Sequence, residues 1–153
     1  EFGKAFELAT STGSSLSLIL CEIADPSSQQ AHGEGVASLM RSYAEQIGSD
    51  ALICNLDDGR VAMLLPNISR RCAARLAVTL CRTTENAGTG SATVTFGVAS
   101  LDSNGDDAAN DRIASAKALM QATSQALHAG IVAGRNCVRV FSPASEQGGK
   151  SAA

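Results

Sequence analysis

Two apolar runs separated by Asp-Asp-Gly constrain the fold of this chain more than any other feature. Residues 51–66 read ALICNLDDGRVAMLLP. Asp-Gly between apolar runs is typical of a tight β-hairpin, because its turn needs positive φ, which Gly and Asp tolerate. Since both runs are apolar at nearly every position, we expect this hairpin in the middle of a sheet, buried on both faces. The preference of Asp for tight turns is enough to explain Asp57 and Asp58. A ligand site at the exposed tip is the alternative.

The composition is that of one ordinary folded domain. The chain has 153 residues, of which 44% are hydrophobic and 18% charged, enough for a real core. The net charge of −3, the 3% aromatic content and the lack of clustered Lys and Arg argue against nucleic-acid binding. No apolar run is long enough to span a bilayer, and no signal peptide is recognisable. We therefore expect a cytoplasmic domain without membrane insertion, a piece of something longer because it begins at Glu1.

The cysteines indicate a reducing compartment. Their number is odd, their spacing is wide, and no CxxC pair occurs. Each lies in or beside an apolar segment, so we expect small buried core residues, with a disulfide framework or a metal cluster as the weaker alternative. The five cysteines are Cys21, Cys54, Cys72, Cys81 and Cys137.

Apolar spacing predicts alternating helices and strands. Spacings of three and four predict helices over residues 2–10, 34–47, 70–82 and 113–132. Short apolar or alternating runs predict strands over residues 16–23, 51–56, 60–66, 92–99 and 137–141. Ser69 and Gly134 are expected to cap helices, and the four arginines of the helix over residues 70–82 to form a solvated face. The prediction is one α/β domain over residues 1–141 and a disordered tail over 142–153.

Four segments, in this order, resemble GGDEF domains, the catalytic module of diguanylate cyclases. LSLILCEIA resembles the family's LALLLLDID strand, and VAMLLP resembles the FAVLLP that follows the signature. VTFGVAS resembles VTxSxGVA, and ALHAGIVAGRNCVRVF resembles ALYxAKxxGRNxV. The resemblance covers residues 2–141. It implies a nucleotidyl-cyclase or palm-like fold, a central five-stranded mixed sheet with a central antiparallel hairpin, flanked by helices.

The resemblance also implies that the signature is degenerate. Counting back from the LLP of VAMLLP, the second segment, Gly-Gly-Asp-Glu-Phe falls on Asp57, Asp58, Gly59, Arg60 and Val61. The paired glycines have become acids. The metal-binding acid has become Gly59, and the next acid has become the cation Arg60, where the family holds Mg²⁺.

Other family positions are kept only in part. The first Asp of DID maps to Glu22, a weak metal-ligand candidate, and the second to Ala24. The family's Lys maps to Ile131, the RxxD motif of product inhibition is missing, and so is the N-terminal DxLTGLPNR motif. The resemblance leaves as nucleotide-binding candidates Glu22, Glu34, Arg60, Arg135 and Asn136. Capping of the last helix is an equal explanation for Arg135 and Asn136.

These substitutions argue against catalysis. Joining two GTP molecules requires Mg²⁺ held by several carboxylates, and here one clear carboxylate, Glu22, is expected to face Arg60. We therefore expect no bound cofactor and a regulatory, dimerising or interaction module in bacterial cyclic di-GMP signalling. Its expected partners are other domains of a larger signalling protein or a second copy.

Two alternatives remain open. The first is a module that binds GTP or cyclic di-GMP without turnover. The second, less favoured, is an active cyclase in which a shifted turn register brings Asp57 and Asp58 to the metal position.

Overall fold

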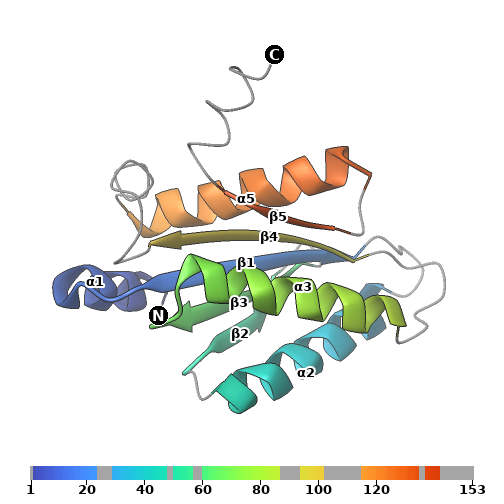
Figure 1. Ribbon diagram of the computed structural model, residues 1–153, viewed down its shortest axis with the longest axis horizontal. Coiled ribbons are helices and arrows are strands. Elements are labelled where there is room, and N and C mark those ends of the chain that lie inside the picture. Colours follow the sequence, from blue (N-terminus) through green and yellow to red (C-terminus); the bar gives the residue numbers. More distant parts are fainter. Residues whose placement is uncertain are drawn as a thin grey trace.

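The protein forms a single five-stranded mixed sheet (Figure 1). The computed structural model describes residues 2–23, 29–47, 50–56, 60–86, 94–101, 115–134 and 137–141. In spatial order the strands are β2 (Leu52–Asn55), β3 (Val61–Pro66), β1 (Leu16–Ile23), β4 (Val94–Leu101) and β5 (Val138–Val140). Neighbouring strands run antiparallel except β4 and β5, which are parallel. The predicted five-stranded mixed sheet with flanking helices is thus confirmed.

Helices cover both faces of the sheet (Figure 1). On one face lie α1 (Phe2–Thr12) and α5 (Ala116–Val132), and on the other α2 (Gln29–Ile47) and α3 (Arg70–Asn86). The α1/α5 core includes Phe6, Leu18, Leu20, Leu64, Leu119 and Leu127. The α2/α3 core includes Ile19, Met40, Met63, Leu76, Leu80 and Phe96. In the described part of the chain, no helix is long and apolar enough to cross a membrane.

Strand β1 lies at the centre of the sheet and is buried on both faces. Successive side chains of a strand point to opposite faces. Leu18 and Leu20 therefore enter the α1/α5 core, whereas Ile19, Cys21 and Ile23 enter the α2/α3 core. This double burial explains why the segment is apolar at almost every position.

The predicted antiparallel hairpin is present, but the expectation that both of its strands lie in the middle of the sheet is wrong. Strand β2 forms the edge of the described sheet, where it pairs with β3 alone, and its Leu52 is 41% exposed. Only β3 is buried throughout, from Val61 to Leu65. The β2 run is apolar because Ala51 and Ile53 pack against the α2/α3 core. An apolar run on a covered edge strand has the same sequence pattern as a central strand.

Three helices extend beyond the ranges predicted for them. Helix α1 continues to Thr12, and the hydroxyls of Thr10, Ser11 and Thr12 donate to carbonyls of the preceding turn. Helix α2 begins at Gln29, although its apolar spacing starts only at Val36. Helix α3 continues to Asn86, and its last turn could not be predicted because it lies beyond the apolar stripe.

The predicted helix caps are present. The Ser69 hydroxyl accepts a hydrogen bond from the Cys72 backbone nitrogen at 3.3 Å, which satisfies a donor at the start of α3. Gly134 follows the C-cap Ala133 with φ of +122°, a conformation that favours glycine. At the start of α5, Ser115 accepts from the Ala118 nitrogen at 3.1 Å. Expected elements within residues 102–114 and the tail 142–153 lie outside the described residues.

The expectation for the cysteines holds in part. All five are free thiols, as predicted, and Cys21 and Cys81 are buried in the α2/α3 core. Cys54 and Cys72 are exposed, so for these two the predicted burial is wrong. Cys54 lies on the edge strand and Cys72 on the outer side of α3, where a neighbouring apolar residue does not imply burial.

Gly97 allows α5 to lie directly on β4. A Cβ atom at Gly97 would lie 2.5 Å from the Leu127 backbone nitrogen and 2.6 Å from the Thr123 backbone oxygen. Both atoms belong to the helix backbone and cannot rotate away. The close approach of α5 to the sheet therefore requires a residue without a side chain at position 97.

We predict that Gly97→Ala destabilises the domain by about 3 kcal/mol or more, because α5 must move off β4. The matched control is Gly3→Ala in α1, where a Cβ would meet nothing within 4 Å. This control should leave the free energy of unfolding unchanged or raise it by up to about 1 kcal/mol. Urea unfolding of both variants measures the difference, and equal stabilities would contradict the prediction.

Candidate functional site

The sheet register places Arg60 against Glu22. Strands β1 and β3 pair with Cys21 opposite Val61, so the next position along β1 faces the residue before β3. The Nε atom of Arg60 lies 3.5 Å from Oε1 of Glu22. The two side chains are 30% and 22% exposed, respectively. The cation and the carboxylate that the resemblance assigns to the family's metal site thus form an ion pair.

A third residue extends this pair across the sheet. Glu22 lies opposite Thr95 on β4, and Thr95 is fully buried. A Cβ atom at Gly130 of α5 would come within 2.8 Å of the Thr95 methyl group, so α5 lies against this position. Sequence reasoning missed Thr95. The small residues Thr95, Gly97 and Ala99 alternate with larger ones along β4, and this pattern could have identified the face that α5 covers.

The backbone fixes Arg60 at the base of the hairpin tip. The Leu56 nitrogen donates to the Arg60 oxygen at 2.7 Å, which closes the hairpin around residues 57–59. Val61, the last position of the signature, begins β3 and is fully buried. Asp57, Asp58 and Gly59 lie outside the described residues.

The other candidates fall in parts of the chain that the structure does not describe. Glu34 belongs to α2, but its side chain is not among those described, and Arg135 and Asn136 lie outside the described residues. Ile131, which replaces the family's Lys, packs as a half-buried side chain against the α1/α5 core. The described site is therefore Glu22 with Arg60 and Thr95.

The described residues do not fit Mg²⁺. Magnesium requires several oxygen ligands in octahedral geometry, usually including one or two carboxylates. Here one carboxylate is paired with a guanidinium, and a fixed cation repels a metal ion at that distance. Across the described ranges, no group of three His, Cys, Asp or Glu side chains could hold a metal.

The ion pair matters for its location more than for stability. Partly exposed pairs of this kind contribute only about 0.2–1 kcal/mol, because water screens them and their side chains lose entropy. The fold therefore does not depend on the pair. Its consequence is to place a permanent positive charge beside Glu22.

Cys21, the neighbour of Glu22 in sequence, is not a reactive group. It is fully buried on the α2/α3 side of the sheet. Burial raises the pKa of its thiol far above the ordinary value of 9.0, and the charges of Cys81 and Glu22 raise the pKa further. A buried, neutral thiol is neither a nucleophile nor a metal ligand.

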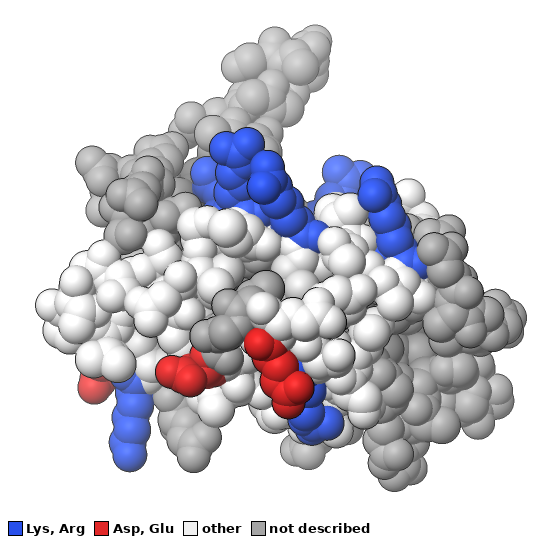
Figure 2. Space-filling model, turned by 60° about the horizontal axis from the view of Figure 1, so that its bottom comes forward, with Lys and Arg blue, Asp and Glu red and all other residues white. Residues whose placement is uncertain are grey.

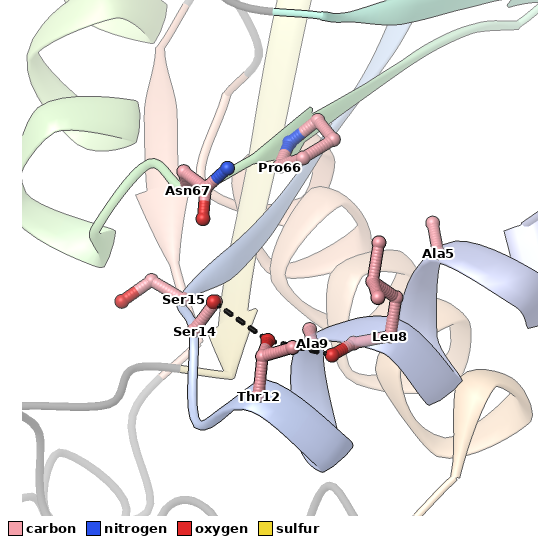
Figure 3. Close-up of a pocket in the computed structure, with 8 residues that line it drawn as sticks. All are labelled: Ala5, Leu8, Ala9, Thr12, Ser14, Ser15, Pro66 and Asn67. Carbon is pink, nitrogen blue, oxygen red and sulfur yellow. Dashed lines mark hydrogen bonds between the residues drawn. The ribbon is translucent and has the colours of Figure 1, made fainter.

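A hollow of about 250 Å³ lies at the opposite end of the sheet (Figure 3). It is lined by Ala5, Leu8, Ala9, Thr12, Ser14, Ser15, Pro66 and Asn67. Leu16 pairs with Pro66, whereas Cys21 pairs with Val61, so the hollow and the ion pair are separated by the length of β1. The hollow is not part of the candidate site.

The prediction of a solvated arginine face on α3 holds for three of its four arginines, since Arg70 is half-buried. Arg71, Arg75 and Arg82 are exposed on this helix. Figure 2 shows Lys and Arg gathered along the upper part of the face that it draws, and further basic side chains lower down, beside the acidic ones.

We predict that stability falls above about pH 9 because of Cys21. The folded protein keeps this thiol protonated, whereas the unfolded chain ionises it near 9.0. The stabilisation is therefore complete below pH 9 and is lost as the pH rises from there. Between pH 8 and pH 10 the free energy of unfolding of the wild type should fall by about 1.4 kcal/mol more than that of Cys21→Ala. Urea unfolding in a reducing agent measures both losses, and parallel losses would contradict this account.

Solved structures identify the fold. No protein-family model and no curated protein matches the sequence. The active GGEEF domain of a diguanylate cyclase from Vibrio cholerae matches with 18% identity and a TM-score of 0.69, covering 92% of each chain. The GGDEF domain of DgcB from Caulobacter crescentus, in complex with c-di-GMP, matches with 17% identity and a TM-score of 0.69, covering 92% of this chain and 83% of that one.

A third structure agrees with these two. The GGDEF domain of FimX from Pseudomonas aeruginosa matches with 22% identity and a TM-score of 0.66, covering 90% of this chain and 87% of that one. At such identities the likeness establishes the fold, and it agrees with the resemblance of the four sequence segments. The chain therefore has the fold of the GGDEF domains of diguanylate cyclases.

Proposed function

We propose that this chain is a degenerate GGDEF domain of bacterial cyclic di-GMP signalling that does not form cyclic di-GMP. It acts as a regulatory, dimerising or interaction module within a larger signalling protein. The observation that carries the proposal is the ion pair between Arg60 and Glu22. In the family this position is expected to hold Mg²⁺.

The chemistry of the reaction supports the proposal. Joining two GTP molecules needs a cation that activates a ribose hydroxyl and neutralises the triphosphate. A guanidinium can neutralise phosphate charge, but it has no open coordination position at which to lower the pKa of a hydroxyl. Arg60 therefore cannot replace the metal in catalysis, although it can replace part of its charge.

A second candidate function is nucleotide binding without turnover. Arg60 and the candidates Glu22, Glu34, Arg135 and Asn136 motivate it. A GGDEF domain of the same fold is known in complex with c-di-GMP, so GTP and cyclic di-GMP are the ligands to test first. The free thiols fit a reducing, cytoplasmic location for either function.

We predict that the purified domain makes no cyclic di-GMP from GTP in Mg²⁺ or Mn²⁺. Loss of metal charge stabilisation costs several kcal/mol, so any product should form at least about a hundred- to thousandfold more slowly than with an active enzyme. Chromatography of the reaction products measures the yield, with the active GGEEF domain from Vibrio cholerae as the positive control. Metal-dependent product formation that Glu22→Gln abolishes would contradict the proposal.

A further inference from the structure

We propose that Arg60 binds the phosphate groups of a nucleotide directly, without a divalent cation, and that Glu22 competes with those phosphates for the guanidinium. This inference rests on the proposed nucleotide-binding function of the same site. It adds how the ligand is held and how the domain limits its own affinity.

The structure already shows Arg60 holding an anionic oxygen. Its Nε lies 3.5 Å from Oε1 of Glu22. Tight charge-assisted hydrogen bonds between such groups measure about 2.7–2.9 Å, so this contact is loose. Both side chains are between a fifth and a third exposed, and water and a dissolved anion can reach them. A loose, exposed pair can exchange its carboxylate for another anion.

Phosphate is an anion that the Arg60 guanidinium can bind through two oxygens at once. A guanidinium presents five N–H donors in a planar fork, which matches two phosphate oxygens at once. The backbone of Arg60 is fixed by the hydrogen bond from Leu56 and by the start of β3. The donor group is therefore carried on a rigid element at the base of the hairpin tip.

Glu22 should oppose phosphate binding. It lies on the central strand β1, and its neighbours Cys21 and Ile23 are fixed by the buried core. The carboxylate therefore stays close to Arg60 and repels an incoming phosphate of the same sign. In a site that uses Mg²⁺, the same carboxylate would hold the metal and increase nucleotide affinity. Glu22 should therefore lower nucleotide affinity in a site where Arg60 binds phosphate directly, and raise it in a site that uses Mg²⁺.

Calorimetric titration of the domain with GTP in EDTA tests whether Glu22 lowers or raises the affinity for the nucleotide. We expect the wild type to bind GTP, and Glu22→Gln to bind it about two- to fivefold more tightly, because a competing surface pair is removed. Arg60→Gln should bind at least about tenfold more weakly, because charge-assisted hydrogen bonds are lost. Inorganic triphosphate should give the same order of affinities, which assigns the contact to phosphate rather than to guanine.

Two control variants carry the same charge changes elsewhere. Arg71→Gln removes an exposed cation from the first turn of α3, and Glu45→Gln removes an exposed carboxylate near the end of α2. Both should bind GTP as the wild type does. Circular dichroism and thermal unfolding verify that all variants are folded.

Several outcomes would overturn the inference. They are a Glu22→Gln variant that binds GTP no better than the wild type, binding that requires Mg²⁺, and binding of GTP without any binding of triphosphate. Absence of binding in the wild type and in Glu22→Gln would also overturn it. None of these results restores catalysis, so the proposed lack of turnover stands or falls separately, on the formation of cyclic di-GMP.

Discussion

The pairing register of β1 with β3 determines both the core and the candidate site. Cys21 lies opposite Val61, and this register places alternate residues of both strands in the two cores. A shift by one residue would turn every side chain of a strand to the other face, so the buried leucines hold the register firmly. The same register brings Arg60 to Glu22. The ion pair is therefore a consequence of core packing, not of its own small energy.

Much of the fold follows from the sequence because burial leaves a clear pattern. The strands β1, β3 and β4 are apolar or β-branched since helices cover both of their faces. The position of β2 could not be predicted in this way. Its Ile53 and Ala51 are apolar because they contact the α2/α3 core, and nothing in a four-residue strand shows how many neighbours it has. An edge strand and a central strand differ in the number of strands that pair with them, and this pairing depends on residues far away in the chain.

The site was predictable only where a motif supplied the alignment. Counting back from LLP assigned Arg60 to a signature position, and the structure places it against Glu22. Thr95 had no motif to mark it, because its position beside Glu22 depends on the pairing of β1 with β4. Gly97 belongs to one of the four matched segments. A glycine is needed there because the α5 backbone approaches this position closely. Family patterns thus record packing constraints as well as chemistry.

We propose that Arg60, a fixed cation paired with Glu22, stands where catalysis would need a metal ion. The most direct test is electron paramagnetic resonance of Mn²⁺ added to the nucleotide-free domain, because the sharp signal of free Mn²⁺ is lost when the ion binds. The account predicts the same free signal with the wild type as with Glu22→Gln. A signal that the wild type diminishes and that Glu22→Gln restores would show that Glu22 binds metal despite Arg60, and would contradict the account.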